Sequence, residues 1–303
     1  MKRIVMGLLS GILFITACGQ TPPLTQPQPD QPTSTSSPLP TADATRTALP
    51  AATPTATLSP TLTPTFLPAN TPTITPTFSP IRSTPPTIML HRSNNDFDSV
   101  QFLKDMIAII KQNDLKVITY QDIYKDPAIT AVEKGHLFII TIDDIYLRYP
   151  IHPSILEMIQ LLREVGYPAV LGIITESEYA YPETATLLKE LSDSGWEIAS
   201  HTNTHANLGQ MEKRRPRYVF IEVSTSMDKI EKVTGIRPIT LILPEGQMVD
   251  DAKFIKRAKI IWAVGINEGI TYNSQRDFIY VGRQGPSVNA EQTFKVLKKR
   301  FGF

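Results

Sequence analysis

The sequence predicts an α/β domain whose parallel strands close into a barrel, and two observations support this class. Apolar runs of strand length recur between segments with helical periodicity, which is the pattern of repeated βα units. These runs are almost continuously apolar, as expected for strands that are covered on both faces. An open doubly wound sheet is the alternative. Its dinucleotide-binding form is disfavoured, because no glycine-rich phosphate loop follows the first strand.

The expected strands occupy residues 87–90, 116–119, 137–142, 169–174, 196–199, 239–243 and 260–264, with a weaker candidate at 278–281. Helices are expected where apolar residues recur at intervals of three and four, which occurs at Leu103/Met106/Ile107/Ile110, Ile155/Met158/Ile159/Leu162, Leu187/Leu188/Leu191, Val223/Met227/Ile230 and Phe294/Leu297/Phe301. Pro182 is suited to the first position of one helix, and Asp250 to the cap of another.

The first 86 residues differ sharply in composition from the remainder. Residues 20–86 contain 17 of the 26 prolines and 18 threonines, but only four charged residues. Such a segment cannot bury enough apolar surface to offset its conformational entropy, so we expect residues 18–86 to be a disordered, extended tether. Residues 87–303 are then left to form one domain. The net charge of +1 offers no electrostatic reason for a nucleic-acid partner.

The amino terminus has the features of a bacterial lipoprotein signal. Residues 1–17 combine Lys2 and Arg3 with an apolar run over residues 4–15, which is the pattern of a signal peptide. The segment Ile15-Thr16-Ala17-Cys18 resembles the lipobox, in which cleavage leaves a lipid-modified cysteine. An ordinary secretory signal or a short anchor is the alternative, although the run is too short to span a bilayer comfortably. We therefore expect lipidation at Cys18 and attachment to the extracytoplasmic face of the cell membrane.

Polar residues of catalytic type follow four of the expected strands. They are His91 after the first strand, Asp143 and Asp144 after residues 137–142, His201 and His205 after residues 196–199, and Glu245 after residues 239–243. In a parallel barrel these strand ends open on one face, where an active site is built. The other two histidines, His136 and His152, lie outside the pattern and are interpreted as ordinary.

The two pairs of polar residues predict a metal site when they are taken together. His201 and His205 have the spacing of one helical turn and can hold one ion. Thr202 stands where a zincin protease needs its glutamate, so that class is excluded. Either pair alone is a weak signal, because such histidine pairs arise by chance and adjacent carboxylates usually form a solvated turn. Their occurrence at successive strand ends favours metal binding. The lone cysteine excludes a cysteine-based zinc site.

Several segments resemble motifs of the NodB-homology polysaccharide deacetylases (carbohydrate esterase family 4). Thr141-Ile142-Asp143-Asp144 resembles the family's T-F-D-D-G motif, Ser200-His201-Thr202-Asn203-Thr204-His205 matches S-H-[ST]-x-x-H, and Leu243-Pro244-Glu245-Gly246 resembles the third motif. The opening Ile88-Met89-Leu90-His91-Arg92 is similar to the M-Y-H-R start of the subgroup that deacetylates poly-β-1,6-N-acetylglucosamine. The resemblance covers essentially all of residues 87–303.

The resemblance implies a deformed (β/α) barrel of about seven parallel strands and removal of acetyl groups from an N-acetylated sugar polymer. Asp144, His201 and His205 would hold a divalent metal ion, with zinc as the expected ion. Asp143 would act as the base, and His91 would act as the acid that protonates the leaving amine. The backbone N–H of Glu245 would meet the charge that develops on the acetyl oxygen. We expect a monomer whose partner is the glycan polymer.

The chain also departs from the family motifs. Ile145 replaces the glycine after the aspartate pair, so a different turn is expected there. Glu245 replaces an aromatic residue, which alters the charge beside the metal and weakens sugar stacking. Ile242 replaces the arginine of the third motif. Arg283, grouped with Glu245 on the substrate side, is the candidate for the cation that orients the base.

Three functions remain open from the sequence. The first is an active N-deacetylase of a polymer such as an exopolysaccharide or peptidoglycan. The second is a glycan-binding lipoprotein that has kept the barrel and lost turnover. The third is a barrel hydrolase of small C–N substrates, against which the secretion signal argues. All five residues assigned to the chemistry are retained, which favours the first.

Overall fold

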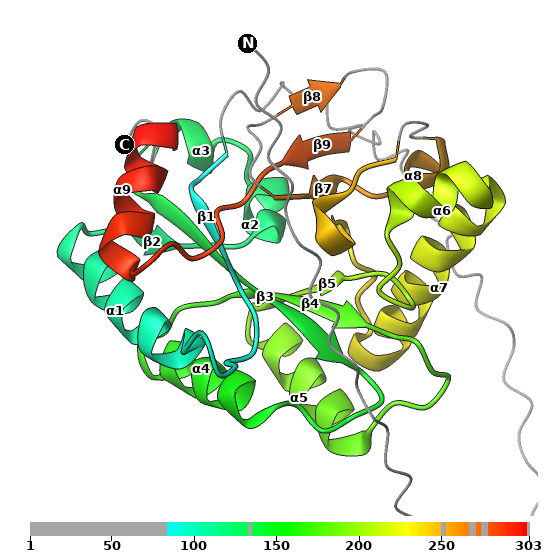
Figure 1. Cartoon of the computed structure of the whole chain (residues 1–303), viewed down its shortest axis with the longest axis horizontal. Coiled ribbons are helices and arrows are strands. Elements are labelled where there is room, and N and C mark those ends of the chain that lie inside the picture. Colours follow the sequence, from blue (N-terminus) through cyan, green and yellow to red (C-terminus); the bar gives the residue numbers. More distant parts are fainter. Residues whose placement is uncertain (1–83, 133–134, 250–252, 267–270, 274–277, 302–303) are drawn as a thin grey trace, which may run out of the picture. The chain divides into compact units, whose positions relative to one another are not determined.

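Seven parallel strands form the centre of the fold in the computed structural model (Figure 1). Their order is β1 (Thr87–Leu90), β3 (Leu137–Tyr146), β4 (Val170–Ile174), β5 (Glu197–Ser200), β6 (Thr240–Ile242), β7 (Trp262–Val264) and β9 (Phe278–Val281). The structure describes residues 84–132, 135–249, 253–266, 271–273 and 278–301. The predicted signal peptide, Cys18, the tether up to residue 83 and the Asp250 cap lie outside these residues.

The sheet curls until its two ends meet. Gln284, shortly after β9, forms a parallel bridge with Ile88 of β1. The Met89 N–H donates to the Gln284 carbonyl at 3.0 Å, and the Gln284 N–H donates to the Thr87 carbonyl at 2.9 Å. A single bridge thus closes the ring where a regular barrel would have a full ladder. The prediction of a deformed barrel of parallel strands is confirmed.

Two strands lie outside the ring. β2 (Lys116–Val117) pairs in parallel with the start of β3, and β8 (Thr271–Asn273) pairs antiparallel with β9. The sequence placed a strand at β2 but not at β8, whose three residues are too few to show a pattern. β3 is also four residues longer than expected, since it continues beyond Ile142 to Tyr146. The aspartate pair therefore lies within a strand and not after its end.

Five helices match the predicted apolar periods: α1 (Ser99–Gln112), α4 (Pro153–Glu164), α5 (Pro182–Asp193), α7 (Pro216–Thr234) and α9 (Ala290–Phe301). Pro182 begins α5 as expected. α8 (Lys253–Arg257) follows the expected Asp250 cap, whereas the sequence did not reveal α2 (Tyr120–Lys125), α3 (Ile129–Val132), α6 (Leu208–Arg214) and the 3₁₀ turn Pro244–Gly246. Each of these is too short to repeat an apolar interval.

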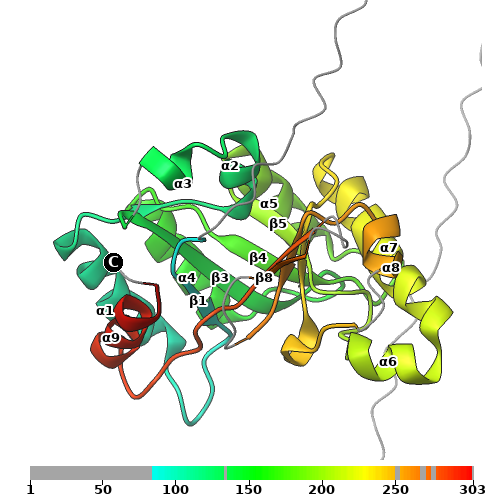
Figure 2. The ribbon, with the colours of Figure 1, turned by 90° about the horizontal axis from the view of Figure 1, so that it is seen from above.

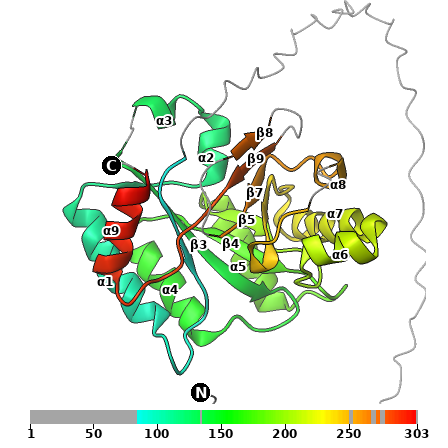
Figure 3. The same ribbon diagram turned by 45° about the horizontal axis from the view of Figure 1, so that its top comes forward.

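The helices cover the outside of the ring. Figure 2 shows α1 and α9 side by side near β1 and β3, and Figure 3 shows α6, α7 and α8 grouped beyond β7. Inside the ring, apolar side chains such as Val170, Ile242 and Trp262 are fully buried. Tyr120 at the start of α2 joins them, with its ring centroid 5.3 Å from that of Trp262. The barrel is packed and not hollow, so a site can form only at an end of it.

No helix in the described part of the chain is both long enough and apolar enough to cross a membrane.

Candidate active site

A β-bulge in β3 places the two aspartates. Ile142 pairs with Leu171 and Ile145 pairs with Ile173, so Asp143 and Asp144 together face the single residue Gly172. Asp144 adopts a left-handed conformation with φ 62°, which aspartate tolerates better than most residues. A methyl group on Gly172 would lie 3.2 Å from Oδ1 of Asp143, so the glycine makes room for this carboxylate. The bulge is the reason why both carboxylates gather at one point of the strand.

Ile145 does not disturb this geometry, contrary to the expectation of a different turn. The left-handed conformation falls on Asp144, whereas Ile145 is extended in β3 and only 1% exposed in the core. No glycine is needed at this position, because its backbone adopts an ordinary strand conformation. The isoleucine adds buried apolar surface directly beside the site.

Asp144, His201 and His205 converge at the carboxyl end of the strands. Oδ1 of Asp144 lies 3.3 Å from Nε2 of His201 and 3.2 Å from Nε2 of His205. One ligand atom from each of the three residues lies within 4.8 Å of the others. Nδ1 of His201 lies 3.0 Å from the Ile242 carbonyl, which can only accept a hydrogen bond. Nδ1 therefore carries the proton, and the lone pair of Nε2 faces the aspartate.

The donor set of this cluster fits a divalent cation. Oδ1 of Asp144 is buried and has no hydrogen-bond donor, which is unusual for a buried oxygen. Burial would raise the pKa of Asp144, but the imidazoles of His201 and His205 bring it well below its usual value. The same carboxylate raises the pKa of His205. The cluster therefore attracts positive charge, and one carboxylate with two imidazoles is a zinc-type ligand set.

The segment that carries the two histidines is a loop and not the helical turn suggested by their spacing. Thr202 and His205 adopt left-handed conformations, with φ 63° and 58°. The carboxylate of Glu222 on α7 accepts hydrogen bonds from the backbone N–H and the hydroxyl of Thr204. Ser200 also hydrogen-bonds Ser226 of α7, with 2.9 Å between the hydroxyl oxygens. These contacts hold the loop in its strained conformation.

Glu222 and Ser226 were not predicted as site residues. Both are buried on the face of α7 that also carries Val223 and Met227. The available signal was a pair of polar residues, one helical turn apart, within an apolar face. Their partners on the histidine loop could not be read from that pattern.

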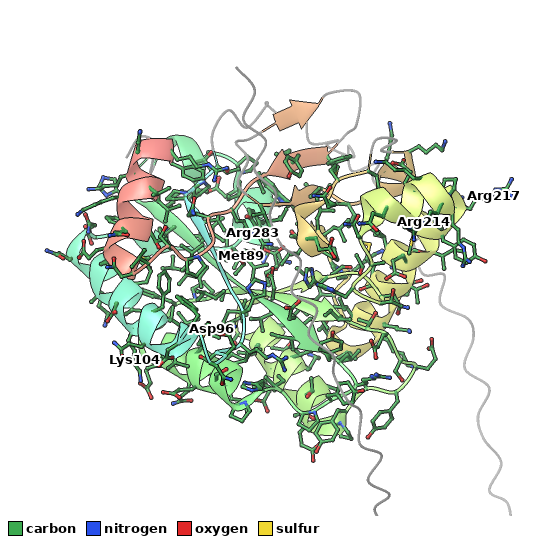
Figure 4. The ribbon with its side chains drawn as sticks, viewed as in Figure 1. Met89, Asp96, Lys104, Arg214, Arg217 and Arg283 are labelled. Carbon is green, nitrogen blue, oxygen red and sulfur yellow. The ribbon has the colours of Figure 1, made fainter. Side chains whose placement is uncertain are left out.

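Asp143 lies beneath the cluster and pairs with Arg283. Nη1 of Arg283 is 2.9 Å from Oδ1 and 2.8 Å from Oδ2 of Asp143, and both side chains are 1% exposed. Arg283 also donates to the Thr141 hydroxyl at 2.7 Å and to the Gly265 carbonyl at 3.2 Å. Arg283, labelled in Figure 4, is fully buried. Its contact with Asp143 fits an orienting role better than a place on the substrate side, and its role stays a prediction.

His91 and Glu245 lie around the same cluster. Nε2 of His91 is 3.9 Å from Oδ2 of Asp144, the oxygen that faces away from the two ligand histidines, and its side chain is 41% exposed. Glu245 has a left-handed backbone with φ 55°, and its carboxylate accepts a hydrogen bond of 2.6 Å from the amide of Asn207. The structure thus brings both residues to the site. Their roles in the chemistry stay predictions.

A hollow of about 520 Å³ opens beside Asp144 and His205 and is bordered by two tyrosines. The rings of Tyr146 and Tyr149 lie 6.0 Å apart. The guanidinium of Arg148, paired with Glu176, lies 4.5 Å from the centroid of the Tyr149 ring. This arrangement fixes an aromatic surface next to the Asp144–His201–His205 cluster. Glu245, in contrast, replaces the aromatic residue of the third motif. His152, interpreted as ordinary, also borders the hollow, and it caps α4.

Comparison with known proteins confirms the family resemblance. Residues 131–260 match the family model described as polysaccharide deacetylase. No curated protein sequence matches the chain. The fold is similar to that of the Streptococcus pyogenes deacetylase PplD in complex with acetate, with a TM-score of 0.56 and 18% identity over 70% of this chain and 97% of that one. It is also similar to that of IcaB from Ammonifex degensii, with a TM-score of 0.57 and 14% identity over 71% and 96% of the two chains.

Proposed function

We propose that this polysaccharide deacetylase is a metal-dependent N-deacetylase of an N-acetylglucosamine-containing polymer at the cell surface. The observation that carries the proposal is the buried Oδ1 of Asp144, which faces two imidazoles and has no hydrogen-bond donor. The Asp143–Arg283 pair beside it supplies a second carboxylate that is free of the cluster. Separate environments for two neighbouring carboxylates suit one ligand and one base.

Asp144, His201 and His205 would hold the divalent metal ion, for which zinc is the best candidate. Such an ion would acidify a water molecule and polarise the acetyl carbonyl. Asp143 would accept a proton from the water that attacks the amide carbon. Arg283 orients Asp143 through its two short contacts and does not touch the sugar.

The remaining roles belong to residues at the rim. The backbone N–H of Glu245 donates to the oxygen on which negative charge develops, an interaction that does not depend on the side chain. His91 protonates the departing amine, because its half-exposed side chain lies at the rim beside Asp144. The products are acetate and a polymer with a free amino sugar.

Acetate release tests the proposal directly. The full chain is incubated with N-acetylglucosamine oligomers and with peptidoglycan, before and after treatment with a chelator, and its metal content is measured. We expect one equivalent of divalent metal, and acetate release that stops with the chelator and returns with zinc. Glycan binding without acetate release from the metal-loaded protein would favour the glycan-binding lipoprotein instead.

His91→Ala tests the general acid. The variant is expected to retain metal and to lose about 10²–10⁴-fold in turnover, the usual contribution of such a group. Loss of metal together with activity would make His91 a ligand. Unchanged activity would remove it from the mechanism.

Anchoring is proposed to occur through a lipid on Cys18, with residues 18–86 as the tether. Cys18→Ser should release soluble protein from the host membrane. Retention of this variant in the membrane fraction would contradict the lipid anchor and leave the deacetylase proposal intact.

A further inference from the structure

Four cations gather where α6 meets α7. Lys213 and Arg214 end α6, Arg215 lies between the helices, and Arg217 is the second residue of α7. All four side chains are exposed, and none has an acidic partner in the described part of the chain. Figure 4 shows Arg214 and Arg217 at the α6–α7 side of the domain. Since the whole chain has a net charge of only +1, this local excess of charge is a distinct feature.

Helix stability explains only part of the cluster. Lys213, Arg214 and the C-cap residue Arg215 complement the negative end of α6, but Arg217 lies in the first turn of α7, which has no acidic residue there. The amino end of a helix carries partial positive charge, so a cation there is unfavourable. A partner of opposite charge would offset this cost.

The cluster borders a hollow whose lining includes the two residues that follow His205. This hollow, of about 300 Å³, is lined by Arg214 and Arg215 together with Ala206 and Asn207. Ala206 and Asn207 directly follow His205, which lines the larger hollow beside Tyr149. Asn207 also holds the Glu245 carboxylate. Consecutive residues of one loop therefore line both hollows, so a chain that passes His205 comes within reach of the arginines.

We propose that the α6–α7 turn binds carboxylates on the same polymer that is deacetylated, and that the preferred substrate is an acidic glycan. The proposal rests on the proposed function for the position of the acetylated sugar. Guanidinium groups bind carboxylates through paired, charge-assisted hydrogen bonds. A membrane surface is the less suitable partner, because a flat surface does not enter the hollow that Arg214 and Arg215 line.

Two soluble polymers with the same backbone test the proposal. Carboxymethyl chitin carries carboxylates and glycol chitin is neutral, and both present N-acetylglucosamine. Binding is measured with metal-loaded and with chelated protein, and acetate release is measured separately. We expect carboxymethyl chitin to bind about tenfold more tightly at low salt, and the preference to disappear near 1 M salt as charges are screened.

The decisive variant is Arg214→Gln/Arg215→Gln. It should lose the preference for carboxymethyl chitin and keep its acetate release from glycol chitin. The matched control is Lys295→Gln/Lys299→Gln, which removes the same charge from the exposed face of α9, on the opposite side of the barrel (Figure 1). This control should retain the preference.

Three results would overturn the proposal. The first is equal binding of the two polymers by the wild-type protein, and the second is a preference for carboxymethyl chitin that survives in the arginine variant. The third is an arginine variant that loses binding only to phosphatidylglycerol vesicles, which would make the turn a membrane contact. Absence of acetate release from both polymers would refute the proposed function instead. The charge-dependent binding would still stand in that case.

Discussion

The two ends of the barrel are built differently. Of the six non-glycine residues with left-handed backbones in the described part of the chain, four lie at the carboxyl end of the strands: Asp144, Thr202, His205 and Glu245. The other two, Asp114 and Lys259, lie in short connections that lead into strands at the amino end. Such conformations cost energy and persist only where surrounding contacts impose them. The strain therefore coincides with the metal-ligand cluster.

At each end one carboxylate that a strand carries is buried, and the two have different partners. At the carboxyl end, Asp143 is paired with Arg283. At the amino end, Glu197 begins β5, accepts a hydrogen bond of 2.9 Å from the Gln121 N–H, and leaves Oε1 without a partner. Burial raises the pKa of Glu197 to about 7. Burial without a facing cation therefore makes the ionisation of Glu197 sensitive to pH near neutrality, whereas Asp143 has the guanidinium of Arg283 at 2.8 Å.

Asp143→Asn tests the carboxyl end most strongly. Asparagine keeps the shape of the side chain and an acceptor for Arg283, but it cannot take a proton from water. Acetate release is expected to fall by about 10²–10⁴-fold, with unchanged metal content. Activity within a few-fold of wild type would mean that Asp143 is only a structural partner of Arg283.

Arg283→Met removes the cation and leaves a buried carboxylate unpaired. Loss of one partner of a buried pair typically costs about 3–5 kcal/mol, to be measured as the free energy of unfolding in denaturant. The control is the double variant Asp143→Asn/Arg283→Met, which should be more stable than Arg283→Met because no buried charge is left behind. Equal stability of these two variants would show that Asp143 is not charged in the fold.

Glu197→Gln tests the amino end through pH. The pKa of Glu197 is raised in the folded state from 4.5 to about 7. The folded state therefore binds this proton more tightly than the unfolded chain does. The resulting stability is fully present below pH 4.5 and is lost as the pH rises through 7. The wild type should lose roughly 3 kcal/mol across this window, whereas Glu197→Gln should lose less. The free energy of unfolding is measured for both proteins at pH 5 and at pH 8. An equal loss of stability between the two pH values would show that Glu197 is not the group that titrates.

Tyr149→Ala probes the rim of the carboxyl end and should have the smallest effect. An aromatic contact is worth about 0.5–1.5 kcal/mol, so KM for a polymer should rise by about 2–10-fold with kcat unchanged. Tyr179→Ala is the matched control, because Tyr179 is 58% exposed and lies outside the hollow. Equal changes in both variants would exclude Tyr149 as a sugar-binding surface.

The sequence by itself determined the class of fold and most of the site. Strands buried on both faces must be continuously apolar, and long helices must repeat their apolar residues, so both features could be read from the local pattern. The candidate metal site was found because the family motifs place Asp144, His201 and His205 at fixed positions. The short elements and the true end of β3 were missed, since a few residues give no period.

Only the tertiary structure decided how the site is held. Arg283 meets Asp143 across 140 residues of chain, Glu222 supports the histidine loop from a different helix, and Gln284 closes the ring on β1. The bulge that gathers the two aspartates lies opposite Gly172 in the neighbouring strand. Each of these contacts joins residues that become neighbours only when the strands pair and curl. No local pattern can record them, because the partner of a buried polar group is set by the packing of the whole barrel.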